Sequence, residues 1–126
     1  MITADTNIFV EYFRGRESSS TKLLEKLLQE HQLVMNPFVL SELISSPKLP
    51  GKIEKNLLSL PQIEIQDGFF ERAGHLRRKI YTHGKGVPMA DVFIAQSCID
   101  SNVSLLTDDQ DLEMISKHSS LSIVKF

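Results

Sequence analysis

Short apolar runs alternate along the chain with longer segments in which apolar residues recur at helical spacing. Helical spacing is clearest in residues 23–28, 39–44 and 69–80. Five short apolar runs are typical of buried strands, namely residues 1–4, 33–36, 63–65, 103–107 and 121–124. Strands that alternate with helices predict βαβ units, and hence a mostly parallel sheet covered by helices on both faces.

Helix-start signals support these boundaries. Asn36 followed by Pro37 provides an N-cap and a proline at the first helical position. Pro88 is expected to open the next helix in the same way, and the serine run at residues 18–20 is a further plausible helix start. In a parallel sheet of this kind, the functional crevice lies beyond the carboxyl ends of the strands.

The size and composition of the chain indicate one soluble domain over residues 1–126, with 41% hydrophobic and 24% charged residues. No apolar run approaches the roughly 18–20 residues that span a membrane, and Asp5 and Glu11 interrupt the place of a signal peptide. The single cysteine, Cys98, cannot form an internal disulfide. We therefore expect a cytoplasmic protein.

The net charge of −2 conceals an uneven distribution of charge. Residues 72–86 hold five cationic residues, two histidines and no acid, whereas six acids and only two lysines follow from Asp91 onward. This pattern predicts a basic surface beside an acidic one. On the charge run alone, an ordinary solvated helix face is the favoured interpretation of the basic segment.

Four acidic stations are expected at one edge of the sheet. Asp5 follows the first strand, Glu42 lies in the helix after the second strand, and Asp91 falls in the first turn of the helix that Pro88 opens. The pair Asp108 and Asp109 ends the strand at residues 103–107. Parallel topology sends all of these side chains to the same crevice.

Several carboxylates in one crevice repel one another, and a divalent cation removes that cost. Oxygen-only ligands suit Mg²⁺ or Mn²⁺, ions that stabilise charge on a phosphodiester and activate water for attack. The residues thus predict metal-dependent phosphodiester hydrolysis. Asp5 and Asp91 would hold the metal, and Asp109 and Glu42 would complete the shell directly or through water.

Each acid also has a structural interpretation. Asp5 is placed to cap the helix that starts near Thr6, and Asp91 is favoured near a helix N-terminus by the helix dipole. Glu42 fits an exposed helix position. Thr107 and Gln110 stand at capping-box spacing, so the acids between and after them fit a helix start.

Four segments, read in order, resemble the PIN-domain nucleases and especially the VapC-type toxins: ADTNIFVEYFRG, SELI, PMADVFIAQSC and SLLTDDQDL. The resemblance covers residues 1 to about 124. It implies a three-layer α/β/α Rossmann-like fold with a mostly parallel sheet. It also implies a Mg²⁺- or Mn²⁺-dependent endoribonuclease that forms a homodimer and, as a toxin, is inhibited by a small cognate antitoxin.

The family pattern maps onto Asp5, Glu42 and Asp91, and its fourth acid, two residues after a Thr or Ser, selects Asp109. By position, Asp5, Asp91 and Asp109 would be metal ligands. Four neighbouring residues would support the site. Thr6 would order it, Asn7 would fix the turn, and Thr107 and Asp108 directly precede the fourth acid. Asp108 stands where the family often has a basic or small polar residue, which leaves Asp108 as an alternative fourth acid and Asp111 as a further candidate.

An RNA substrate requires cations at the rim of the crevice. Arg14 and Lys85 are the preferred candidates for contact with RNA, and Lys85 lies between two glycines shortly before the Asp91 helix. The further available cations are Arg16, Arg77, Arg78 and Lys79.

Other functional classes explain fewer of these residues. A receiver-type phospho-accepting domain would use Asp67 after the third strand and Thr107 after the fourth, but it leaves Glu42 and Asp91 without a role. A phosphatase with an aspartate nucleophile would require an acid where Asn7 stands. A catalytically silent PIN fold that serves as a binding module is a third alternative. The four histidines show no metal-ligand spacing, and Cys98 has no local histidine partner.

Overall fold

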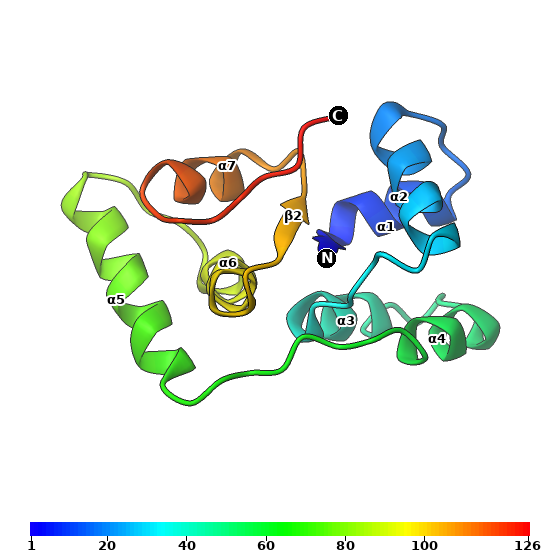
Figure 1. Cartoon of the computed structure of the whole chain (residues 1–126), viewed down its shortest axis with the longest axis horizontal. Coiled ribbons are helices and arrows are strands. Elements are labelled where there is room, and N and C mark those ends of the chain that lie inside the picture. Colours follow the sequence, from blue (N-terminus) through cyan, green and yellow to red (C-terminus); the bar gives the residue numbers. More distant parts are fainter.

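Seven helices surround a small parallel sheet in the computed structural model, which describes residues 1–126 (Figure 1). The elements in chain order are β1 (Ile2–Ala4), α1 (Thr6–Phe13), α2 (Ser19–Gln29), α3 (Pro37–Ile44), α4 (Gly51–Leu58), α5 (Phe69–Thr82), α6 (Met89–Ser101), β2 (Ser104–Leu106) and α7 (Gln110–Lys117). None of these helices is both long and apolar enough to cross a bilayer.

The sheet is centred on β1 and β2, which pair in parallel with Ala4 opposite Leu106. Isolated parallel bridges extend it: Ile2 to Leu33 and then Met35 to Gln62 on one side, and Leu105 to Ile123 on the other. The resulting order is segment 62, segment 33–35, β1, β2, segment 123. The predicted parallel sheet is therefore confirmed, although three of its five segments are joined to it only through isolated bridges.

The third strand is displaced from the predicted residues 63–65. Pairing occurs at its beginning, where Met35 N–H donates to the Pro61 carbonyl and Ile63 N–H donates to the Met35 carbonyl. The chain then leaves the sheet, and the Gln66 side chain donates to the Asp100 carbonyl at the end of α6 (2.8 Å). That side-chain contact has no counterpart in the apolar pattern from which the strand was predicted.

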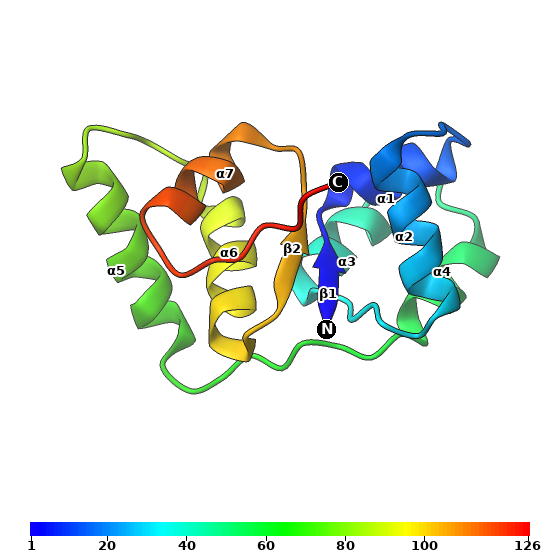
Figure 2. The ribbon, with the colours of Figure 1, turned by 45° about the horizontal axis from the view of Figure 1, so that its top comes forward.

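The helices form a layer on each side of the sheet. Figures 1 and 2 both show α5, α6 and α7 on one side of β1 and β2, with α1, α2 and α4 on the other. Helix α3 packs against both α1 and α6. The largest fully buried side chains come from both layers and from the sheet between them, among them Phe9, Phe69, Ile94 and Leu105.

Two of the predicted helix starts are confirmed, and a third is shifted by one residue. Asn36 caps α3 by accepting from Phe38 N–H (3.0 Å), and Ser18 caps α2 in a capping box with Thr21. Pro88 is the N-cap of α6 rather than its first helical residue. Figure 2 shows that α1, α6 and α7 all begin near the edge to which the arrows of β1 and β2 point.

Candidate metal centre

Asp5 is held rigidly at the carboxyl edge of the sheet. Its N–H continues the β1–β2 ladder by donating to the Leu106 carbonyl (3.0 Å), and the residue is only 6% exposed. Oδ1 accepts from Thr6 N–H (2.8 Å), so Asp5 is also the N-cap of α1. Asp5 is therefore both the helix cap that the sequence predicted and a carboxylate at the predicted edge of the sheet.

Two threonines connect three of the predicted acids. The Thr107 hydroxyl donates to Oδ2 of Asp5 (3.1 Å) and accepts from Asp109 N–H (3.0 Å). On the other side of Asp5, the Thr6 hydroxyl donates to Oε1 of Glu42 (3.0 Å). Residues that lie far apart in sequence are therefore joined in one hydrogen-bonded chain.

Asp91, Asp109 and Asp111 form the densest group of carboxylates. One oxygen from each of the three lies within 4.8 Å of the others. Asp91 is in the first turn of α6, and Asp111 is in the first turn of α7. Asp109 is the N-cap of α7, and its Oδ1 accepts from the N–H groups of Asp111 and Leu112 at 2.8 and 3.1 Å.

The acids perturb one another because they share a partly buried crevice. Burial raises the pKa of Asp91 to about 7, and the charges of Asp109, Asp5, Asp111 and Glu42 act in the same direction. Burial also raises the pKa of Asp5, an effect that the hydrogen bonds from Thr6 and Thr107 oppose. Both shifts arise first from burial, and the neighbouring acids, which have no cationic partner, add to them.

The donor set fits a hard divalent cation. Every candidate ligand is a carboxylate oxygen, and no lysine, arginine or histidine forms an ion pair with any of these acids. Oxygen-only sites of this kind suit Mg²⁺ or Mn²⁺. A bound cation would neutralise the repulsion that raises the pKa values of Asp5 and Asp91.

The sequence model of the PIN domain matches residues 2–117 of the chain. The chain belongs to the PIN-domain family. No curated protein sequence matches it. The family and the α/β fold that its resemblance implied are thereby confirmed, and the receiver-type alternative is wrong.

Solved structures support the same fold. FitAcB from Neisseria gonorrhoeae is 20% identical with a TM-score of 0.74, and the match covers 99% of this chain and 97% of that one. VapBC2 from Rickettsia felis, bound to a DNA fragment from its promoter, is 23% identical with a TM-score of 0.74 and covers 100% and 99%. A toxin–antitoxin complex from Klebsiella pneumoniae is 21% identical with a TM-score of 0.71 and covers 88% and 89%.

Two of the predicted supporting residues, Asp108 and Asn7, are exposed and lie outside the hydrogen-bonded cluster of acids. Asp108 is exposed and lies outside the carboxylate trio, which contains Asp109 and Asp111 instead. Asn7 is exposed and its side chain forms no hydrogen bond, because the turn is closed by the Asp5 side chain on Thr6 N–H. The helix start predicted at the acids after Thr107 is confirmed, but its N-cap is Asp109, so the capping box of Thr107 with Gln110 is wrong.

The predicted RNA contacts have different surroundings. Arg14 lines a groove together with Thr6 and Glu42, so the structure brings it into the same groove as one of the predicted acids. Lys85 is exposed in the loop between α5 and α6, and its side chain forms no hydrogen bond or ion pair. Lys48 lines the same groove as Arg14 and was missed by the sequence analysis. Its only signal was a position six residues after Glu42, within a proline-flanked turn.

The residues of the rejected classes lie elsewhere. The Asp67 carbonyl accepts from Arg72, whose guanidinium pairs with Asp100 near the C-terminal end of α6. Asp91 is near the opposite end of this 13-residue helix, nine residues and about 14 Å away along its axis. Cys98 is fully buried, and burial raises the pKa of its thiol to about 12, which leaves it inert as a nucleophile.

Proposed function

We propose that this PIN domain is a metal-dependent endoribonuclease that hydrolyses RNA phosphodiester bonds. The observation that carries this proposal is the carboxylate trio of Asp91, Asp109 and Asp111, which has no cationic partner and is next to the buried Asp5. A crevice of uncompensated acids destabilises the fold unless a cation occupies it. This is the expected condition of a metal-dependent hydrolase in its metal-free form.

Asp91, Asp109 and Asp111 would hold Mg²⁺ or Mn²⁺ together with the neighbouring Asp5. When bound, the cation would supply charge stabilisation on the phosphodiester and lower the pKa of the attacking water. Glu42 is exposed and accepts a hydrogen bond from the Thr6 hydroxyl, so it would complete the shell through water and accept a proton. Thr107 orients Asp5 and fixes the start of the α7 segment.

We further propose that the protein is the toxin of a toxin–antitoxin pair. The support is the resemblance to VapC-type toxins together with structural neighbours that are toxin–antitoxin complexes. An antitoxin of this kind requires a surface close to the active site. The chain offers one beside α1.

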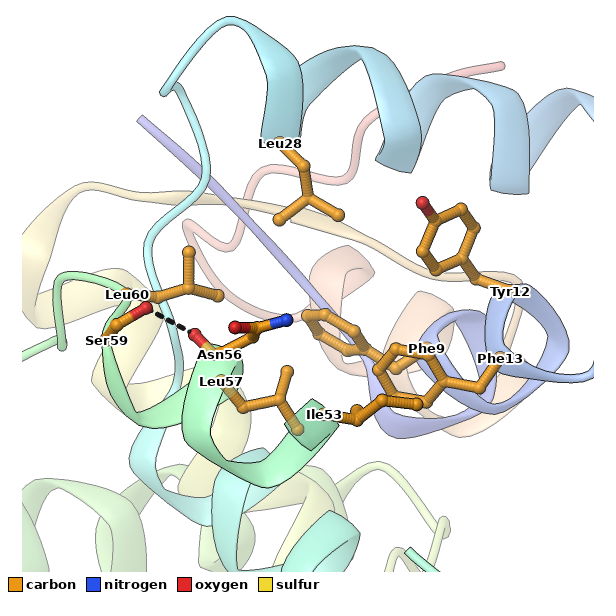
Figure 3. A pocket seen from close by; sticks show the side chains of 9 residues that line it. All are labelled: Phe9, Tyr12, Phe13, Leu28, Ile53, Asn56, Leu57, Ser59 and Leu60. Atoms are coloured by element: carbon orange, nitrogen blue, oxygen red, sulfur yellow. Dashed lines mark hydrogen bonds between the residues drawn. The ribbon is translucent and has the colours of Figure 1, made fainter. Parts of the chain in front are cut away.

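That surface is an apolar groove of about 400 Å³ between α1, α2 and α4 (Figure 3). Figure 3 shows Phe9, Tyr12 and Phe13 on one side, Leu28 above, and Ile53 with Leu57 from α4 below. Phe13 and Ile53 also line the groove that contains Glu42, so the two grooves are neighbours. An apolar helix of the antitoxin that filled the first groove would end next to the acids.

A homodimer in the cytoplasm is the state in which we propose that the toxin acts. An exposed aromatic side chain supports association with a second copy: Phe70 is 63% exposed and makes edge contacts with Phe69 and Phe93. The molar mass in solution, measured by light scattering for the wild type and for Phe70→Ser, tests this. A monomeric wild type would contradict it.

The proposed activity is tested by incubating labelled RNA with the protein in Mg²⁺, in Mn²⁺ and in chelator. Cleavage is expected with either metal, none with chelator, and none by the Asp5→Asn variant. Metal-dependent cleavage that survives in Asp5→Asn would overturn the site, and a lack of all cleavage would favour a silent binding module. Toxin identity is tested by whether induced expression stops growth and co-expression of an adjacent small open reading frame relieves it.

A further inference from the structure

The groove that adjoins Glu42, called here the Glu42 groove, has a composition suited to a nucleotide. It lies between α1, α3 and the segment that leads into α4, and it has a volume of about 410 Å³. This volume falls within the range of roughly 300–1,000 Å³ that is typical of sites for small ligands. Its wall and floor are formed mainly by five apolar side chains: Val10, Phe13, Leu43, Leu49 and Ile53.

The groove opens directly beside the acidic site. Thr6 and Glu42 both line it, and the Thr6 hydroxyl donates to Glu42. Thr6 N–H in turn donates to the Asp5 carboxylate. A strand whose phosphate reached Asp5 would therefore have its neighbouring nucleotide at the mouth of this groove.

The groove also carries cations that the protein leaves unpaired. Arg14 and Lys48 line it, both are exposed, and neither forms an ion pair or a side-chain hydrogen bond. The contrast with Arg16 is informative, because Arg16 is two residues from Arg14 and is paired with Glu11 at 3.0 Å. Two free cations above an apolar floor complement a phosphate above a base.

We infer that the Glu42 groove binds the nucleotide adjacent to the scissile phosphodiester, with its base against Phe13 and Leu49 and its phosphate between Arg14 and Lys48. A base reaches such a groove only when it is unstacked, so the substrate is single-stranded at the cut. Stacking on an aromatic side chain and contact with cations together provide binding that tolerates different sequences. The inference rests on the proposed nuclease function, because it places the RNA strand relative to Asp5 and Glu42.

The test measures RNA binding in the Asp5→Asn background, which keeps the RNA intact. The probes are a fluorescein-labelled single-stranded RNA of mixed sequence, a strand of abasic ribose phosphates of the same length, and an RNA duplex. Arg14→Ala and Lys48→Ala are each expected to weaken binding of the single strand and to reduce the salt slope of log K by about 0.7. Arg16→Ala, the matched control, is expected to change neither quantity.

The contribution of the base is measured separately. The abasic strand is expected to bind roughly 5-fold or more weakly than the RNA, because base stacking is lost. Leu49→Ser is expected to reduce that difference without changing the salt slope. The duplex is expected to bind equally to the parent and to Leu49→Ser.

The outcomes separate this inference from the nuclease proposal. Metal-dependent cleavage by the wild type, with unchanged salt slopes in Arg14→Ala and Lys48→Ala, would overturn the groove inference alone. An absence of cleavage by the wild type would overturn the proposed function. Variants that bind RNA normally but lose affinity for the co-expressed antitoxin would make the groove a protein-docking site and overturn the inference.

Discussion

Helix α6 carries an aspartate near each end, and the two have opposite environments. Asp91, in the first turn, is surrounded by other acids, and burial together with their charges raises its pKa to about 7. Asp100, near the last turn, accepts two hydrogen bonds from the Arg72 guanidinium, at 3.0 and 2.7 Å, and one from Gln96 at 2.8 Å. The Arg72 hydrogen bonds lower the pKa of Asp100.

The difference runs against the helix dipole, which favours a carboxylate at the N-terminus and disfavours one at the C-terminus. The dipole contributes about 0.3–1 kcal/mol, less than one pKa unit at about 1.4 kcal/mol per unit. Burial and the neighbouring acids therefore decide the pKa of Asp91, and the hydrogen bonds from Arg72 decide that of Asp100. A structural aspartate has its counter-charge within the chain, whereas the candidate site leaves the counter-charge to be supplied by a ligand.

The largest expected difference between the two ends of α6 is in activity. Asp91→Asn is expected to reduce metal-dependent RNA cleavage by more than about 100-fold, because it removes a ligand at the reacting centre. Asp100→Asn makes the same chemical change on the same helix, and we expect its folded form to cleave within a few-fold of the wild type. Initial rates of RNA cleavage at equal concentrations of folded protein compare the two, and equal losses would remove the distinction.

A divalent cation should stabilise the folded protein through Asp91 and not through Asp100. Since the ion binds the folded state, Mn²⁺ at a concentration of 100 Kd is expected to add about 2.7 kcal/mol at pH 8. The gain should be smaller at pH 5, where protonation of Asp91 competes with the ion. Thermal unfolding with Mn²⁺ and with chelator measures both gains, and stabilisation of Asp91→Asn by as much as the wild type would contradict the assignment.

The pH dependence of the metal-free protein provides a third comparison. The pKa of Asp91 is raised in the folded state, so its contribution to stability is present below its ordinary pKa and is lost as pH rises through about 7. Asp91→Asn should therefore have a higher Tm than the metal-free wild type at pH 8, by a few degrees, and little advantage at pH 4. Melting curves in chelator across this range test the sign, and an advantage that grows toward low pH would refute it.

The smallest effect is expected at the compensated end. Arg72→Ala removes the partner of Asp100, and because the guanidinium is partly exposed we expect a Tm lower by only roughly 1–4 °C. Arg78→Ala is the matched control, because Arg78 is on α5 like Arg72, is exposed and forms no ion pair. Cleavage by folded Arg72→Ala should stay close to that of the wild type. A loss comparable to that of Asp91→Asn would show that the two ends of α6 are coupled.

The acidic site was predictable because the topology of the sheet could be inferred from the alternation of strands and helices. Once β1 and β2 are parallel neighbours, Asp5 and Asp109 must meet at one edge, and Thr107 lies between them. The starts of α2 and α3 were readable for a different reason, since capping is a local interaction of Ser18 and Asn36 with the next turn. The parts that could be predicted from the sequence therefore follow mainly from local helix capping and from the order of the strands in the sheet.

The rest depended on side-chain contacts between distant segments. The exposure of Asp108 and Asn7 could not be predicted, because a shift of one residue at a turn decides whether a side chain faces the crevice or the solvent. The Glu42 groove, with Lys48 at its rim, requires the packing of α1 against the segment that leads into α4, for which the sequence has no periodic signal. After the third strand, the contact of the Gln66 side chain with the end of α6 likewise joins segments that are distant in sequence.

The central claim is that the carboxylates of Asp5, Asp91, Asp109 and Asp111 together hold a divalent cation. Titration calorimetry of Mn²⁺ into the metal-free protein tests it most directly, with Asp91→Asn and Asp100→Asn in parallel. We expect binding by the wild type and by Asp100→Asn, with release of protons at pH 7 because Asp91 is partly protonated there, and loss of binding in Asp91→Asn. Undiminished Mn²⁺ binding by Asp91→Asn would contradict it.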